Sequence, residues 1–199
     1  MKFLTRWAVM AGACLLAASA IAQPMTVADV KYEETASVSG STLQLNGAGV
    51  RYKAVFKVYT AGLYLEKKAG TPAEVMAQKG PKRMSITMLR DIDSTELGKL
   101  FSRGMEDNMD RAAFSKLIPG VLRMSQIFSD HKKLVAGDQF QIDWIPGTGT
   151  IITVKGKPQG EPFKEPEFFN ALLGIWLGNA PADWKLKDAL LGKTAQSPS

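Results

Sequence analysis

Residues 45–66 constrain the fold most, because they join two glycines, one arginine and a long apolar run. Gly47 and Gly49 stand just before Arg51, and the segment 56–66 then reads Phe-Lys-Val-Tyr-Thr-Ala-Gly-Leu-Tyr-Leu-Glu. Glycine lets a ligand or a second backbone approach closely, and a guanidinium is a permanently charged fork that suits a carboxylate or a developing oxyanion. The apolar, aromatic run favours a strand. The segment therefore predicts a strand with a candidate anion-binding arginine near its start.

The first 22 residues predict an export signal that is removed before the protein acts. Lys2 and Arg6 precede the uncharged stretch 7–22, which ends in Ala-Ile-Ala. A basic start, an apolar centre and small residues at the cleavage point are typical of a secretory leader. The 16 uncharged residues also fall short of the roughly 20 that a membrane-spanning helix needs. We expect cleavage after Ala22, a periplasmic or secreted bacterial protein, and no transmembrane segment in the mature chain.

Cleavage would leave a chain without cysteine, because Cys14 is the single cysteine. The segment 11–14, Ala-Gly-Ala-Cys, keeps a lipoprotein cleavage site open as the alternative. The 177 residues that remain of 199 can form no disulfide, thiol nucleophile or thiolate metal site. His131 is the single histidine, and we expect it to cap an exposed helix end. With so few ligands, we expect neither a metal nor a cofactor.

The charge pattern argues against nucleic acid as a partner. Removal of Lys2 and Arg6 lowers the formal net charge from +6 to +4. The remaining basic residues stand in small clusters among acidic ones, whereas a nucleic-acid surface needs a basic stripe with interleaved aromatic residues. The chain also lacks a Gly-x-Ser-x-Gly elbow and a phosphate-binding loop. No feature of the sequence specifies an oligomeric state.

The mature chain predicts one domain over residues 23–192 and a flexible tail over 193–199, because no repeat or long linker divides it. The hydrophobic periodicity predicts strands at 27–38, 42–45, 52–65, 83–89, 139–145 and 150–155. Helix signals predict helices at 73–79, 93–108, 121–128, 166–178 and from 183 onward. We expect 47–49 to form a turn and Pro119-Gly120 to break the helical middle. This order predicts an α+β domain, in which helices cover one face of an antiparallel sheet.

Asn108 and Arg51 each allow a structural and a functional interpretation. Asn108 continues the apolar stripe of the helix expected at 93–108. An unpaired buried amide would cost roughly 1–3 kcal/mol, so Asn108 either bonds nearby backbone or faces a ligand cleft. Arg51 either forms a surface contact or salt bridge, or it holds an anion or a carbonyl oxygen.

Thr60 and Tyr64 would share one face of an unbroken strand over 52–65, and Arg51 would fall on the other face. A bulge or kink would be needed to bring the three side chains together. Packing in the core or at its rim is the default expectation for Tyr59, Thr60 and Tyr64.

The sequence Gly-Ala-Gly-Val-Arg at 47–51 and the sequence Lys-Val-Tyr-Thr-Ala-Gly-Leu-Tyr-Leu-Glu at 57–66 resemble the chalcone isomerase superfamily. That superfamily carries a similar Gly-Val-Arg and Lys-Phe-Thr-Ala-x-Gly-x-Tyr-Leu-Glu on its strand pair. The likeness extends through 93–108 and 170–178, and it is greatest to the bacterial exported branch. The resemblance implies an open-faced β-sandwich, in which a large antiparallel sheet is covered by a layer of helices with a ligand cleft between them.

In the plant enzymes of this superfamily, an arginine polarises the carbonyl of an enone while a ring closes. A threonine and a tyrosine organise water there, and an asparagine and a second hydroxyl residue hold the phenolate ring. By resemblance, Arg51, Thr60 and Asn108 match the arginine, the threonine and the asparagine. Phe101 and Ile175 stand where the enzymes carry the tyrosine and the second hydroxyl residue. These two replacements imply a more apolar cleft.

The superfamily also has non-catalytic members that bind fatty acids through the equivalent arginine. We therefore expect an exported protein that binds a small amphipathic ligand, a fatty or aromatic acid. The residues expected to line its cleft are Arg51, Thr60, Tyr64, Phe101, Asn108 and Ile175. One alternative is a cofactor-free isomerase, an intramolecular lyase that acts on an enone through Arg51, Thr60 and Asn108. Another is a partner-binding domain whose cleft is filled by side chains.

Overall fold

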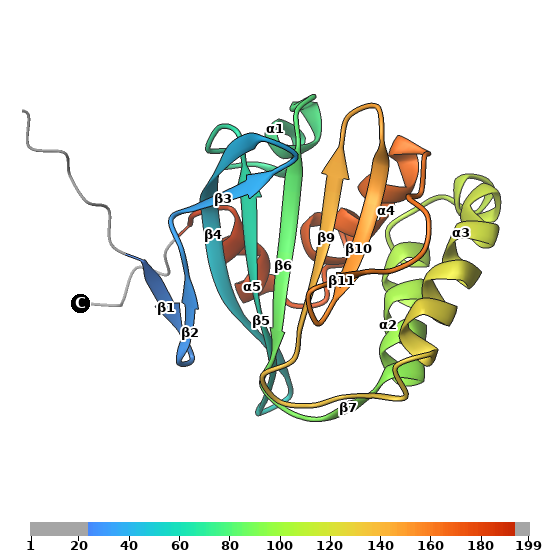
Figure 1. Cartoon of the computed structure of the whole chain (residues 1–199), viewed down its shortest axis with the longest axis horizontal. Helices are drawn as coiled ribbons and strands as arrows, with labels where there is room; N and C mark the ends of the chain where they lie inside the picture. Colours follow the sequence, from blue (N-terminus) through green and yellow to red (C-terminus); the bar gives the residue numbers. More distant parts are fainter. Residues whose placement is uncertain (1–23, 194–199) are drawn as a thin grey trace, which may run out of the picture.

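One curled antiparallel sheet of seven strands organises the computed structural model, which describes residues 24–193 (Figure 1). Its strands, in spatial order, are β11 (Lys157–Pro158), β10 (Gly149–Val154), β9 (Gln139–Ile145), β6 (Lys82–Met88), β5 (Phe56–Leu65), β4 (Ser41–Lys53) and β3 (Thr35–Val38). Two short strand pairs stand apart from this sheet, namely β1 (Met25–Val27) with β2 (Val30–Tyr32) and β7 (Ile92–Asp93) with β8 (Lys133–Leu134). The leader expected at 1–22, with Cys14, and the tail beyond 193 lie outside the described residues.

Five helices complete the described fold: α1 (Pro72–Ala77), α2 (Ser94–Glu106), α3 (Arg111–Ser129), α4 (Pro166–Leu177) and α5 (Trp184–Leu190). Helices α4 and α5 lie against the sheet, and α2 packs on both α3 and α4 (Figure 1). Helix α4 is apolar on nearly every side, because nine of its twelve residues are buried. A helix buried all round belongs in the centre of the core. No helix within 24–193 combines the length and hydropathy needed to cross a bilayer.

Successive side chains of β5 face two different hydrophobic clusters, as the period of a strand requires. Tyr59, Ala61 and Leu63 enter the large cluster beneath the helices. Tyr64 points the other way, into a smaller cluster that includes Tyr32 from β2. The sheet therefore has a helix face and an outer face, and the β1–β2 hairpin covers part of the outer face.

The α+β architecture predicted from the sequence is confirmed, but several element boundaries are corrected. The segment 27–38 forms three short strands rather than one. The strand expected over 52–65 is divided by a tight turn at Ala54-Val55, where β4 and β5 pair as a hairpin. Helix α3 runs through Pro119 without a break. Burial of its apolar face, which includes Val121 and Met124, outweighs the backbone hydrogen bond lost at proline.

Two smaller predictions about helix ends have different outcomes. Asp93 caps α2 as expected, and its carboxylate accepts the backbone N–H of Glu96 at 2.9 Å. His131 does not cap α3, because Asp130 is the last residue of that helix end. The imidazole instead lies partly buried, with Nε2 3.1 Å from the side-chain oxygen of Gln159.

The turn expected at 47–49 is wrong, because Gly47 and Gly49 lie inside β4 and support α5. A Cβ atom at Gly47 would overlap the carbonyl oxygen of Ala189, and one at Gly49 would lie 2.7 Å from the Ala189 side chain. The glycines are thus needed for close helix–strand packing rather than for a left-handed backbone. This contact fixes where α5 and the loop before it lie on the sheet.

We predict that Gly47→Ala lowers the free energy of unfolding by about 1–3 kcal/mol or more, since the added methyl group must displace the backbone of α5. Gly70→Ala is the matched control, because a Cβ there meets only one flexible carboxylate at 3.9 Å. The control should leave stability unchanged or raise it by up to about 1 kcal/mol. Urea denaturation monitored by circular dichroism measures both, and equal midpoints for the two variants would contradict the close-packing account.

Candidate functional site

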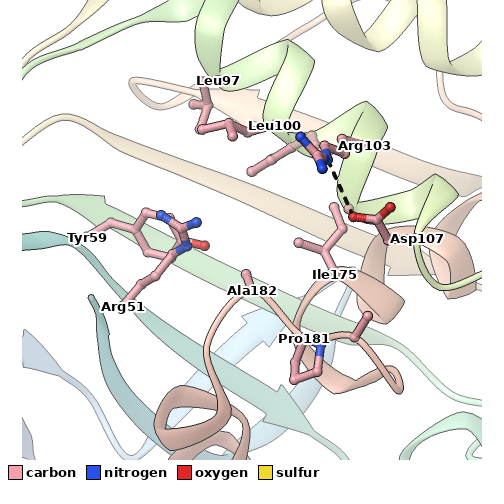
Figure 2. A pocket seen from close by; sticks show the side chains of 12 residues that line it. Arg51, Tyr59, Leu97, Leu100, Arg103, Asp107, Ile175, Pro181 and Ala182 are labelled. Atoms are coloured by element: carbon pink, nitrogen blue, oxygen red, sulfur yellow. Dashed lines mark ion pairs between the residues drawn. The ribbon is translucent and has the colours of Figure 1, made fainter. Parts of the chain in front are cut away.

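A cavity of about 170 Å³ lies on the helix face of the sheet, between the β4–β5 hairpin, α2, α4 and the loop that leads to α5 (Figure 2). Its strand wall holds one charged and one phenolic side chain, and its other walls are apolar except for the Arg103–Asp107 ion pair at the end of α2. The lining residues are Arg51, Tyr59, Leu97, Leu100, Phe101, Arg103, Gly104, Asp107, Ile175 and residues 180–182. The cavity therefore combines a cation with an apolar interior, which is the arrangement that an amphipathic anion requires.

Arg51 enters this cavity because it pairs directly with Tyr59 across the β4–β5 ladder. Residues opposite each other in an antiparallel pair project from the same face. The guanidinium carbon lies 5.5 Å from the centre of the Tyr59 ring, within range of a cation–π interaction. The Arg51 side chain is partly buried, and among residues 24–193 no hydrogen bond or ion pair engages its guanidinium. Its donors are therefore available to a ligand.

Asp183 illustrates why no acid neutralises this arginine. Asp183 is close enough to interact electrostatically with Tyr59, but the Asp183 carboxylate caps α5. One oxygen accepts the backbone N–H of Tyr52 at 2.8 Å, and the other accepts those of Lys185 at 2.8 Å and Leu186 at 3.2 Å. A carboxylate bound to three N–H groups is held in its capping position.

Tyr59 supplies a second polar group at the strand wall. Its hydroxyl oxygen accepts the indole N–H of Trp176 at 2.9 Å, which leaves the hydroxyl hydrogen free for donation. Burial raises the pKa of Tyr59 to about 12, and the nearby positive charge of Arg51 opposes part of that rise. The phenol therefore stays protonated at neutral pH and remains a hydrogen-bond donor.

The opposite wall of the cavity is formed by apolar side chains of α2 and α4. Figure 2 shows Leu97, Leu100 and Ile175 across the cavity from Arg51. Phe101 is buried behind them and meets the Trp176 ring edge-on, with 5.6 Å between ring centres. Such edge-to-face aromatic packing stabilises this end of the cavity.

Asn108 lies next to the cavity but does not line it. Its amide nitrogen donates to the carbonyl oxygens of Gly104 at 2.8 Å and Ala180 at 2.9 Å, and its oxygen accepts the N–H of Ala180 at 2.8 Å. The prediction that Asn108 bonds nearby backbone is confirmed. The side chain fastens the loop 180–182 to the end of α2, and that loop forms one wall of the cavity.

Thr60 and Tyr64 lie on the outer face of the sheet, away from Arg51. The Thr60 hydroxyl accepts the Tyr32 hydroxyl at 2.8 Å, and the Tyr64 hydroxyl donates to the carbonyl of Glu33 at 3.0 Å. A bulge does occur, between Arg51 and the next residue of β4. Because it follows Arg51, it does not transfer Arg51 to the face of Thr60 and Tyr64.

The structure thus brings together three of the six predicted site residues, namely Arg51, Phe101 and Ile175. Tyr59 was missed as a site residue, because only its position on a strand could be predicted. A two-residue turn at 54–55 alone would pair Arg51 with Val58, and the register shift between Arg51 and Tyr52 makes Tyr59 the partner instead. Within residues 24–193, no group of three or more histidine, cysteine or acidic side chains is placed to hold a metal ion.

We predict that Asn108→Ala lowers the free energy of unfolding by about 1–3 kcal/mol, because the Ala180 backbone groups lose their partners. Asn179→Ala is the matched control, since Asn179 is exposed in the same loop and makes no side-chain hydrogen bond in the described part of the chain. Its effect should stay within about 0.5 kcal/mol. Guanidinium denaturation compares the two, and an equal loss of stability would show that the Asn108 bonds do not fasten the loop.

Comparisons with known proteins agree with this architecture. A family model described as chalcone isomerase-like matches residues 24–192. The crystal structure of a fatty-acid binding protein from Arabidopsis thaliana matches with a TM-score of 0.67 and 15% sequence identity, over 85% of this chain and 96% of that one. At that identity the likeness shows a shared fold. A search of curated protein sequences gave no match. Because the family model spans nearly all of the described residues, this chain belongs to the chalcone isomerase-like family.

Proposed function

We propose that this protein binds a small amphipathic organic acid, and that Arg51 holds its carboxylate. The observation that carries the proposal is a partly buried guanidinium that faces the cavity without an ion pair among the described residues, while Asp107, the acid in the cavity lining, pairs with Arg103. A partly buried cation is costly unless an anion accompanies it. A ligand carboxylate would provide that anion. The fatty-acid binding protein of the same fold lends support, since such ligands combine a carboxylate with an apolar body.

Two donors at the strand wall would determine how the carboxylate binds. A guanidinium presents two parallel N–H groups that match the two oxygens of a carboxylate, and hydrogen bonds of this charged kind are short and strong. The free hydroxyl hydrogen of Tyr59 can reach a carboxylate at Arg51, because its ring lies against the guanidinium. Since Trp176 fixes the Tyr59 hydroxyl, this donor is held in place before the ligand arrives.

The apolar part of the ligand would lie against Leu97, Leu100 and Ile175. Each buried methylene group contributes about 0.8 kcal/mol, so even a short apolar body adds considerably to the affinity. The cavity volume of about 170 Å³ is close to the roughly 150 Å³ that accommodates a benzene molecule. A single ring or a short chain fits this volume. A longer acyl chain would extend past the loop 180–182 or require α2 and α4 to separate.

The geometry supports an enone isomerase less well. That function was expected to use Thr60 and Asn108 beside Arg51. Thr60 lies on the outer face of the sheet with its hydroxyl bonded to Tyr32. Both ends of the Asn108 amide are engaged by backbone groups. Of the three groups, only Arg51 faces the cavity. A single cation is enough to bind an anionic ligand, whereas the isomerase reaction was expected to need the other two groups as well.

We predict that Arg51→Ala weakens the binding of benzoate-type and alkyl carboxylates by about 10–100-fold, since hydrogen bonds to a charged group contribute about 1.5–3 kcal/mol. Arg51→Lys should retain part of the affinity, because it keeps the charge but loses the planar fork. Isothermal titration calorimetry on delipidated protein measures both. Mass spectrometry of the native protein then identifies the acid that co-purifies with it.

Arg111→Ala is the matched control, because Arg111 is an exposed arginine at the start of α3, outside the cavity. It should bind like the unaltered protein. Equal affinities of Arg51→Ala and Arg111→Ala would refute Arg51 as the anchor. Failure of the unaltered protein to bind any acyl or aromatic acid would refute the proposed function itself.

We also propose that the protein is exported, because residues 1–22 have the composition of a secretory leader. Amino-terminal sequencing of the protein recovered from a bacterial periplasmic extract should then begin at Gln23. Recovery of the chain from the cytoplasm with Met1 or Lys2 at its start would contradict export. A lipidated chain that begins at Cys14 would support the lipoprotein alternative instead.

A further inference from the structure

The turn between β4 and β5 differs in composition from the other hairpin turns of the described fold. The others contain glycine or polar residues, at 28–29, 39–40, 146–148 and 155–156. Such residues are usual in turns because they tolerate a left-handed backbone and bond to water. The β4–β5 turn consists of Ala54 and Val55 alone, and Phe56 follows it. This tip is therefore apolar where hairpin tips are normally polar.

The tip exposes its apolar side chains to solvent. Val55 is 82% exposed and Phe56 is 57% exposed. Ala54 adopts φ = 54°, in the left-handed region, which costs a non-glycine residue about 1 kcal/mol. Exposed apolar groups on a strained backbone do not stabilise the fold. Exposed apolar side chains and backbone strain of this kind indicate a site that binds another molecule.

Basic side chains surround the tip. Lys53 and Lys57 flank it in the sequence, and the Arg90 guanidinium lies 5.0 Å from the centre of the Phe56 ring. Among the described residues, neither Lys57 nor Arg90 takes part in an ion pair. The tip thus presents two apolar side chains inside a ring of positive charge.

Three acidic residues also lie near the tip, and one of them pairs with Lys53. Glu96 is 3.8 Å from the Lys53 amine, and Asp91 is 2.6 Å from the amine of Lys133. Asp93 caps α2. Among these described charges, Lys57 and Arg90 take part in no ion pair, and the Lys53–Glu96 pair is long and exposed, so these basic groups can bind an anionic surface.

Two further aromatic residues extend the same end of the hairpin. Tyr52 is 39% exposed and Trp184 is 61% exposed. Their backbone segments are linked, because the backbone N–H of Tyr52 donates to the carboxylate of Asp183, the residue before Trp184. Tyrosine and tryptophan are the side chains that favour the boundary between lipid headgroups and acyl chains.

We infer that the β4–β5 hairpin tip docks the protein on an anionic lipid surface. Val55 and Phe56 would enter the boundary between headgroups and acyl chains, while Lys53, Lys57 and Arg90 bind lipid phosphates. A protein partner fits less well, because specific interfaces need roughly 800 Å² on each side and the tip offers two large apolar side chains on a convex turn. Arg51 lies two residues before Lys53, so docking would place the cavity that Arg51 lines close to the membrane, which is a source of amphipathic acids.

The test attaches an environment-sensitive dye to a single cysteine at the tip. The full chain with Cys14→Ser and Val55→Cys carries the dye at the tip. The full chain with Cys14→Ser and Thr148→Cys carries it on the β9–β10 turn, which is exposed at the opposite end of the sheet (Figure 1). Vesicles of phosphatidylcholine with about one-third phosphatidylglycerol serve as the probe, and vesicles of pure phosphatidylcholine test the need for anionic lipid.

On the anionic vesicles, the dye at residue 55 should shift to the blue and be quenched by nitroxide-labelled lipids, whereas the dye at 148 should not respond. Replacing both Lys53 and Lys57 by alanine should lower the partition coefficient about 25-fold, since each basic residue near an anionic surface contributes about 1 kcal/mol. A silent dye at residue 55, or equal responses at 55 and 148, would overturn the inference. No response at residue 55 would favour a protein partner for the tip. Equal responses at residues 55 and 148 would show that another segment or the dye itself causes binding.

Discussion

The register of β4 against β5 is the constraint on which the rest of the structure depends. Pairing of Arg51 with Tyr59 directs both side chains toward the helices. The same register puts Gly47 and Gly49 beneath α5, where any side chain would collide with that helix. It also brings the chain to its turn at 54–55. Because side chains alternate along a strand, a slip of one residue would exchange the two faces and remove the arginine from the cavity.

The outer face of the sheet is held by a few specific contacts rather than by a second layer of helices. Tyr32 packs where Gly62 leaves room for its ring, and its hydroxyl is bonded to Thr60. Burial raises the pKa of Tyr32 to about 12. The same cause raises the pKa of Tyr64 to about 12. Both phenols are therefore neutral hydrogen-bonding groups over the physiological range. Thr60 thus has a structural role that its position in the family motif does not reveal.

Local sequence patterns were sufficient for the class of fold, but not for the composition of the cavity. Alternation and helix signals are local, so strands such as β9 and the cap at Asp93 could be predicted from nearby residues. The turn at Ala54-Val55 has no glycine or asparagine and could not be recognised. The unrecognised turn and the register shift between Arg51 and Tyr52 together concealed the pairing of Arg51 with Tyr59. The packing of α5 on Gly47 joins segments far apart in the chain, and no local pattern carries that information.

The β4–β5 hairpin carries both a wall of the cavity and the apolar tip. Arg51 lies on β4 between the α5 contact at Gly49 and the tip at Val55. The backbone of Tyr52 is bonded to Asp183, which caps α5 and follows the loop at 180–182. The Tyr52–Asp183 bond therefore links the hairpin near its tip to the segment that carries a wall of the cavity. Asn108 bonds to the backbone of Ala180 on the other side of that loop, so the loop is attached both to the end of α2 and to the hairpin.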